Sequence, residues 1–257
     1  MQGIHETLNA ICSSAAWSQE RVRLLSEKLK PLLPALHKCE CVMATEDEGK
    51  KWLIANGFFV PEGSVVSASG VRKAADEVGY PVVLKMIGPL LAHKTEAGAI
   101  ALNLNDAEMV NAAVAQMKLD VAAFNPNAIT NQFLVEAMSP TPVAELIVTL
   151  RRDPQFGMAL VLGSGGVLVE LVADTTTLLL PTSTVEITRA LLGLRVGRLL
   201  EGFRGGSTVD IHKIAAQIYQ MCIAYLENCH AIVEIEINPL CVYSEKICAV
   251  DALVHMA

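Results

Sequence analysis

Two carboxylates and an amide alternate along an apolar segment near the C-terminus of this chain. Glu234, Glu236 and Asn238 are separated by isoleucines, so an extended backbone would point all three side chains to one face. Asp251 follows thirteen residues after Asn238, and a hairpin would return it alongside them. Carboxylate and amide oxygens are ligands that Mg²⁺ accepts together with phosphate oxygens and water. The sequence therefore predicts a magnesium site, although the same alternation also fits the solvated face of an edge strand.

A second chemical feature is a lysine within an apolar segment. Lys85 stands in the run from Pro81 to Ile87, whose other residues are all apolar. Burying an ammonium group without a partner is costly, so a bound phosphate would explain this lysine, as would an exposed strand end. His93 lies in a predicted loop, where it could be a simple surface residue. The glycines of Gly163-Ser-Gly-Gly166 allow close approach of the backbone to a ligand, and they equally fit a plain hairpin turn.

The composition excludes several classes of protein. The 257 residues are 52% hydrophobic and only 18% charged, which predicts a well-buried core and a surface partly covered by another chain. A net charge of -7 provides no basic surface for nucleic acid. We expect no signal peptide and no membrane span, and hence a cytoplasmic protein, because apolar runs are short and interrupted. The seven cysteines are scattered and predict neither a zinc site nor a disulfide framework.

Helices and strands alternate along the chain and predict an α/β (α+β) fold. Apolar residues at helical spacing predict a helical N-terminal extension, 1–45. A small lobe, 46–131, and a larger lobe with an antiparallel-rich sheet, 132–257, are expected to follow. Asp106 is expected to cap a helix. The expected helices are 46–55, 70–78, 106–117, 185–194 and 209–226, and the expected strands are 64–67, 81–87, 99–104, 133–137, 145–151, 158–162, 167–173, 232–237 and 246–251.

The segment Glu236-Ile-Asn-Pro-Leu240, with the later Asp251, resembles the metal-binding signature of the β subunit of succinyl-CoA synthetase and of ADP-forming acyl-CoA synthetases. Those proteins have the ATP-grasp fold, in which two lobes enclose a nucleotide cleft. Ala99, Thr149 and Ala137 depart from the usual pattern of that branch. Further segments match the branch in the same order: Gly79 to Met86, His93 to Gly98, Phe133 to Ala137, Glu145 to Val148, Arg152 to Gly157, Gly163 to Glu170 and Leu200 to Gly205.

The resemblance implies a role for individual residues. It places Lys85 at the nucleotide phosphates, Val135 and Glu136 in the hinge that reads the adenine, and Glu145 near the ribose or base. Arg204 would pair with a phosphate, or simply with a neighbouring carboxylate. The implied set is Lys85, Val135, Glu136, Glu145 and Arg152 for the nucleotide, Asn238, Asp251 and Glu236 for the metal, and His93 and Arg204 for catalysis, with His93 accepting or relaying a phosphoryl group.

The resemblance also implies an activity and a partner. The chain would be the subunit of an ADP-forming acyl-CoA synthetase that binds ATP and Mg²⁺ and releases ADP, with an acyl phosphate and a phosphohistidine as intermediates. We expect a CoA-binding α-type subunit as partner, and therefore a hetero-oligomer, because the first 45 residues are too few for a nucleotide-binding βαβ unit. The alternatives are a non-catalytic ATP-grasp-like subunit and a carboxylate-amine ligase of the same fold.

Overall fold

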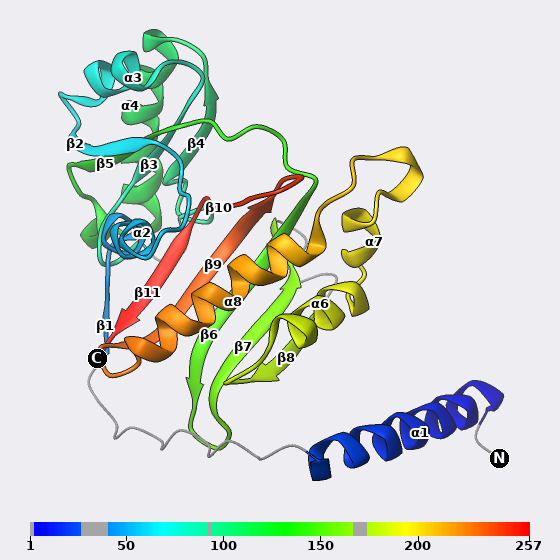
Figure 1. The fold of residues 1–257 in the computed structure, drawn as a ribbon. Coiled ribbons are helices and arrows are strands. Elements are labelled where there is room, and N and C mark those ends of the chain that lie inside the picture. The colour runs from blue at the N-terminus through cyan, green and yellow to red at the C-terminus, as the bar shows by residue number, and fades with distance from the viewer. Residues whose placement is uncertain (1–2, 27–40, 92–93, 167–173) are drawn as a thin grey trace. The chain divides into compact units, whose positions relative to one another are not determined.

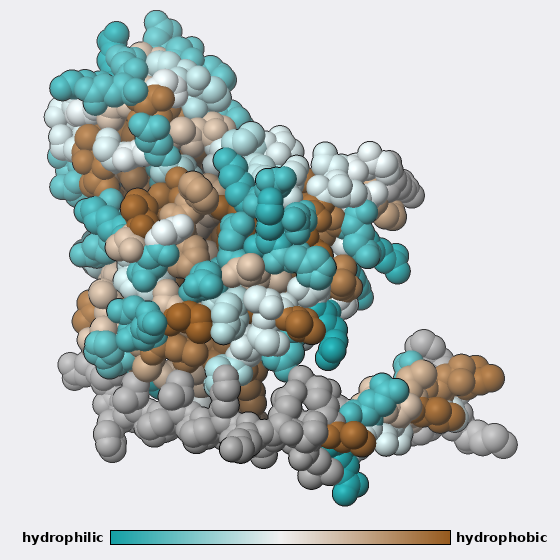
Figure 2. Space-filling model, viewed as in Figure 1, coloured by the Kyte–Doolittle hydropathy of each residue, from teal (hydrophilic) through white to brown (hydrophobic). Residues whose placement is uncertain are grey.

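The computed structural model describes residues 3–26, 41–91, 94–166 and 174–257 (Figure 1). The chain separates into two compact units, Met1–Pro34 and Ala35–Ala257. The first unit contains α1 (Ile4–Ser26), whereas residues 27–40 of the expected helical extension, 1–45, lie outside the described residues. Figure 2 shows hydrophobic surface along this helix. Ile4, Trp17 and Val22 are among its exposed side chains. Among the helices that the structure describes, none combines the length and the apolar character needed to cross a membrane.

The second unit contains a small antiparallel sheet of four strands. Its order is β2 (Gly63–Ser67), β5 (Gln132–Ala137), β3 (Val82–Met86) and β4 (Ile100–Leu104). The helices α3 (Val71–Val78) and α4 (Ala107–Phe124) pack against this sheet (Figure 1), and η1 (Pro126–Ala128) follows α4. Asp106 caps α4 as predicted, since its carboxylate accepts a hydrogen bond from the Met109 amide at 2.8 Å.

The same unit contains a larger sheet of seven strands. The order along its main path is β1, β11, β9, β6, β7 and β8, while β10 pairs with β9, and every pairing is antiparallel. The longest strand, β9, is central and pairs with both β6 and β11. The strands are β1 (Val42–Met43), β6 (Ala144–Asp153), β7 (Gly157–Ser164), β8 (Thr175–Leu179), β9 (Ile232–Val242), β10 (Ile247–Ala249) and β11 (Ala252–Met256).

Helices cover one face of the larger sheet (Figure 1). They are α6 (Thr184–Gly193), the short α7 (Gly197–Leu200) and α8 (Ile211–Glu227), with η3 (Phe203–Gly205) between the last two. Ile214, Ile218 and Tyr225 recur at helical spacing along α8 and are buried in one core with Ile235 and Ile237 of β9. The small sheet has a separate core cluster of its own. The mixed α/β fold with antiparallel sheets is thus confirmed.

The helix α2 (Glu46–Ala55) belongs to the core of the larger sheet. A capping box begins it, in which Thr45 and Glu48 bond each other's backbone amides. Leu53 is buried in the larger core, and Gly49 lies against Val254 of β11. Since β5 lies within the small sheet, the strand pairing differs from the expected lobe boundaries of 46–131 and 132–257. We propose a small lobe of 63–137, with 41–58 joining 138–257 in the larger lobe.

Two expected strands need comment. The expected strand 167–173 lies outside the described residues. The expected strand 246–251 is in fact β10 alone, and the chain continues past Val250 and Asp251 into β11. The interruption arises because β9 pairs with two successive strands. Its Leu240 lies opposite Ala249, the last residue of β10, and its Ile237 lies opposite Ala252, the first residue of β11. Asn238 and Asp251 therefore face each other where the two ladders meet.

Candidate functional site

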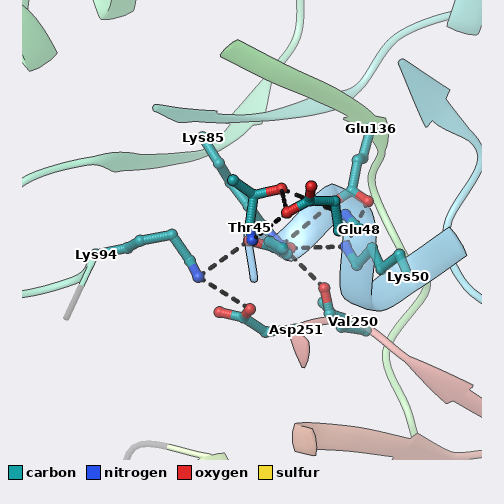
Figure 3. A network of polar contacts seen from close by, with 9 residues as sticks. Thr45, Glu48, Lys50, Lys85, Lys94, Glu136, Val250 and Asp251 are labelled. Carbon is teal, nitrogen blue, oxygen red and sulfur yellow. Dashed lines mark hydrogen bonds and ion pairs between the residues drawn. The ribbon is translucent and has the colours of Figure 1, made fainter. Parts of the chain in front are cut away.

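Six charged side chains from distant parts of the chain meet where the small sheet adjoins the core of the larger one (Figure 3). We call them the charge cluster. Five of the six side chains are at most 7% exposed, whereas that of Asp251 is 25% exposed. Three are cations and three are anions, so the cluster is neutral as a whole. The members are Glu46 and Lys50 of α2, Lys85 of β3, Lys94, Glu136 of β5 and Asp251.

Lys85 lies between two carboxylates. Its Nζ atom is 2.5 Å from Glu46 Oε1 and 3.1 Å from Glu136 Oε2, and it also donates to the Val250 carbonyl at 2.9 Å. Lys50 Nζ contacts the same two acids, lying 2.8 Å from Glu46 Oε1 and donating to Glu136. The buried Lys85 ammonium thus has two hydrogen bonds and a second carboxylate within ion-pair distance, and these offset the cost of its burial.

Lys94 links the two ends of the charge cluster. Its Nζ atom lies 3.0 Å from Glu46 Oε2 and 3.0 Å from Asp251 Oδ1. A tight turn positions it, because the Ala99 amide donates to the Lys94 carbonyl at 2.8 Å and Gly98 adopts a φ of 65°. A side chain at Gly98 would also collide with Asp120, with its Cβ only 2.7 Å from that of Asp120. Glycine at this position therefore fixes where the Lys94 side chain starts.

Mutual attraction shifts the pKa of three members of the charge cluster, Lys85, Lys94 and Glu46, toward their charged forms. Burial alone would lower the pKa of Lys85, but attraction to Glu46, Glu136 and Asp251 outweighs it and raises the pKa above its usual value. Burial likewise opposes ionisation of Lys94, and Asp251 and Glu46 together still raise its pKa. The pKa of Glu46 is lowered: burial would raise it, and the three surrounding lysines, led by Lys85, overcome that effect.

Asn238 and Asp251 form the second part of the site. The backbone amide of Asn238 donates to the Asp251 carbonyl at 3.3 Å, so the predicted hairpin does return Asp251 beside Asn238. Glu236 is half-buried two residues before Asn238 in β9, opposite Leu253. The described residues contain no cluster of three or more acidic, histidine or cysteine side chains that could hold a metal ion. The Asp251 carboxylate and the Asn238 amide oxygen instead fit Mg²⁺, which takes few protein ligands and completes its shell with phosphate oxygens and water.

The glycine loop after β7 connects Asn238 to Glu145. The Gly166 amide donates to Asn238 Oδ1 at 3.1 Å, and Gly165 donates to the Glu145 carbonyl at 2.8 Å. Gly166 has a φ of 77°, and a Cβ on it would lie 2.0 Å from Glu145 Oε2. Glycine is required here both for the backbone angle and for the space. Two predicted site residues, one for the nucleotide and one for the metal, therefore meet on either side of a single glycine.

Val135 and Arg152 have other surroundings. Val135 packs in the core of the small sheet, and its backbone runs between β2 and β3. Arg152 lies seven residues from Glu145 along β6, roughly 23 Å away. There its Nη2 donates to the Cys229 carbonyl at 2.5 Å. His93 lies outside the described residues, and only the backbone of Arg204, in η3, is described.

Three members of the charge cluster were missed in the sequence. The sequence indicates an ordinary acidic residue in the first turn of a helix at Glu46. It indicates a solvent-exposed ion-pair partner at i+4 for Lys50. Lys94 stood in a segment that matched the acyl-CoA synthetase branch, yet it had no strand position that would direct its side chain. The available signal was that Glu46 and Lys50 share one helix face with the buried Leu53.

Comparison with known proteins identifies the class. The ATP-grasp domain family matches residues 37–256, which include every element of the second unit that the structure describes. The chain therefore belongs to the ATP-grasp family, and this fold implies that it binds ATP.

Within that family its relatives are ADP-forming CoA ligases. The β subunit of acetate–CoA ligase (ADP-forming) I of Pyrococcus furiosus is 32% identical over 216 residues, which cover 84% of this chain and 92% of that protein. The β subunit of isoenzyme II from the same organism is 30% identical, over 80% of this chain and 89% of the relative. A structure of the dinucleotide-forming acetyl-coenzyme A synthetase 1 of Ca. Korarchaeum cryptofilum, with coenzyme A and Ca-AMPCP, has a TM-score of 0.78 at 32% identity. That similarity covers 84% of this chain and 94% of the synthetase chain.

These similarities confirm the prediction of an ATP-grasp subunit of the ADP-forming acid–CoA ligase type over that of a non-catalytic subunit. Both Pyrococcus proteins are named as β subunits, which supports the existence of a partner subunit.

Proposed function

We propose that the charge cluster, Glu145 and the Asn238–Asp251 pair together form the Mg-ATP site of an ADP-forming acid–CoA ligase. The observation that carries this proposal is the position of Lys85 and Lys94, two buried ammonium groups within one ion-pair network that reaches Asp251. Buried lysines beside a hard-oxygen donor pair suit the phosphates and the metal of one nucleotide. A related synthetase from Ca. Korarchaeum cryptofilum, 31% identical, has been solved with Mg-AMPPCP, which supports magnesium here.

The residues would have separate tasks in phosphoryl transfer. Lys85 would bind phosphate oxygens, while the Asp251 carboxylate and Asn238 amide oxygen would hold the cation, and Glu145 would accept hydrogen bonds from the ribose or base. Mg²⁺, when bound, supplies positive charge that offsets the charge developing on the transferred phosphoryl group. Glu136 would keep Lys85 ionised and oriented through its contact at 3.1 Å. We leave Val135 and Arg152 out of this assignment, because each is engaged elsewhere.

The complete reaction would join an acid to CoA with cleavage of ATP to ADP and phosphate, through an acyl phosphate and a phosphohistidine. His93 and Arg204 remain predictions for the phosphoryl-transfer step. The partner would be a CoA-binding α-type subunit in a hetero-oligomer. In support, the chain corresponds to 92% of a protein named as a β subunit but to only 35% of the longer 4-hydroxybutyrate–CoA ligase of Nitrosopumilus maritimus.

The test combines binding with phosphoryl transfer. The chain is mixed with its candidate CoA-binding subunit, γ-labelled ATP, Mg²⁺ and phosphate acceptors, and labelled protein histidine and ADP release are measured. We expect labelling that requires both subunits and that Asp251→Asn abolishes. Lys213→Met is a matched control, because Lys213 is an exposed lysine with one carboxylate partner, Glu245, at 3.0 Å. Intact ATP binding without label on either subunit would contradict the proposal.

A further inference from the structure

The two charges that the proposed function reserves for a ligand already have partners within the chain. Asp251, the proposed metal ligand, is 3.0 Å from the ammonium of Lys94. Lys85, the proposed phosphate-binding residue, is 2.5 Å from Glu46. Glu46 Oε2 in turn lies 3.0 Å from Lys94 Nζ. A cation thus stands beside the metal ligand, and an anion stands beside the phosphate ligand.

We propose that, in the nucleotide-free protein, Lys94 substitutes for the metal ion and Glu46 substitutes for the phosphate. As a consequence, the site selects the metal–nucleotide complex over either component alone. Lys94 is then a specificity-determining residue. The inference rests on the proposed function, since it takes Asp251 as a metal ligand and Lys85 as a phosphate ligand.

The charge balance of the cluster supplies the reason. A metal ion that binds Asp251 must approach its oxygens to about 2.0–2.1 Å, which is incompatible with an ammonium held at hydrogen-bond distance from the same carboxylate. Lys94 must then leave Asp251, and three lysines would face only Glu46 and Glu136 inside the protein. Uncompensated charge in a buried site is strongly unfavourable. Metal binding without a nucleotide is therefore weak.

A nucleotide without a metal meets the opposite difficulty. Its phosphates would lie beside Glu46, Glu136 and Asp251, whose charges are balanced only by the three lysines already paired with them. The complex of metal and nucleotide brings both charges together, so Lys94 can turn from Asp251 to the phosphates while the metal takes its place. Each ligand then raises the affinity of the site for the other, by the same factor in both directions.

The structure also shows why Lys94 can be the residue that moves. Its ammonium is shared between Glu46 and Asp251, so it can release one partner and keep the other. Asp251 is the most exposed member of the charge cluster, with 25% of its side chain accessible, and a metal ion can reach it from solvent. Lys85 is held more firmly, by two carboxylates and the Val250 carbonyl, so it must give up Glu46 when it binds a phosphate.

The test measures metal binding directly, with Mn²⁺ as the probe and ADP as the nucleotide. Free Mn²⁺ is followed by electron paramagnetic resonance, with and without ADP, and the data are corrected for the Mn–ADP complex that forms in solution. In the unmodified chain we expect ADP to tighten Mn²⁺ binding by about tenfold or more. In Lys94→Met we expect Mn²⁺ alone to bind about tenfold more tightly than to the unmodified chain, and the enhancement by ADP to shrink.

Two matched variants separate this effect from a general loss of positive charge. Lys94→Arg keeps the cation and is expected to bind free Mn²⁺ as weakly as the unmodified chain. Lys213→Met removes an exposed ion-paired lysine and is expected to change nothing.

The outcomes distinguish the inference from the proposed function. The inference is overturned if the Lys94→Met variant binds free Mn²⁺ no more tightly than the unmodified chain does. Equal Mn²⁺ affinity of the unmodified chain with and without ADP would also overturn it, and this measurement does not depend on the folding of any variant. If Asp251→Asn leaves binding of the Mn–ADP complex unchanged, the metal site of the proposed function itself is wrong.

Discussion

Replacing Lys85 by methionine tests whether the charge cluster is held together as described. The methionine side chain is similar in length to that of lysine and is apolar, so β3 and the core of the small sheet need not change. The substitution removes a cation that is 3% exposed and leaves Glu46 and Glu136 to share Lys50 and Lys94. The cluster then carries an uncompensated negative charge in a buried position.

The size of the effect follows from these contacts. Breaking a buried ion pair by removal of one partner costs about 3–5 kcal/mol. We expect the lower end, about 3 kcal/mol of unfolding free energy, because Glu46 retains Lys50 at 2.8 Å and Lys94 at 3.0 Å. For a unit of this size, such a loss lowers the melting temperature by about 6–12 °C.

The assay is thermal and urea unfolding of the nucleotide-free chain, followed by circular dichroism. The double variant Lys85→Met with Glu136→Gln restores neutrality, since two lysines then face Glu46 and Asp251. We therefore expect it to be more stable than the sum of the two single losses predicts, by about 1–3 kcal/mol. The reasoning is refuted if Lys85→Met costs less than about 1 kcal/mol, or if the two losses simply add.

Three further predictions follow from other features. Gly166→Ala should weaken ADP binding about tenfold in calorimetric titrations, because its φ of 77° and the Glu145 carboxylate exclude a side chain. Gly193→Ala, where nothing lies within 4 Å, should leave binding unchanged. The free energy of unfolding should fall as the pH is lowered below about 4.5, because the pKa of folded Glu46 is lowered from that value. It should fall again as the pH is raised above about 10.5, because the pKa of folded Lys85 is raised from that value. Tyr225→Phe should cost about 1 kcal/mol in urea unfolding without changing ADP affinity, since it removes the bond to the Val233 carbonyl at 2.9 Å.

Local patterns were sufficient to predict most elements. The limits of α2 follow from Thr45 as its cap and from Asn56-Gly57 after it, so the expected range 46–55 agrees with the structure. The predicted helix after Asp106 was too short, ending at 117, whereas α4 continues to Phe124. The strands β1 and β8 were not predicted, since β1 has only two residues and the sequence of β8, Thr-Thr-Thr-Leu-Leu, does not alternate between polar and apolar residues.

The site was predictable only where it depends on one hairpin. Alternation along β9 and the return of the chain through β10 were enough to bring Asp251 beside Asn238. The helix face that Glu46 shares with Leu53 is a local sign of burial, but no local pattern reveals its partners, Lys85, which comes 39 residues later, and Lys94 beyond it. The structure buries Lys85 beside Glu46 and Glu136, the chain's own carboxylates, and its role at the nucleotide phosphates stays a prediction.

The origin of the charge cluster has a mechanical consequence. Glu46 and Lys50 are on a helix whose core belongs to the larger sheet, and Asp251 lies between two strands of that sheet, whereas Lys85 and Glu136 are on strands of the small sheet. The pairs Lys85–Glu46, Lys50–Glu136 and Lys85–Val250 therefore tie one folding core to the other. A hinge motion of one sheet against the other must lengthen these bonds, so any exchange of partners within the cluster also changes how stiffly the two halves of the enzyme are coupled.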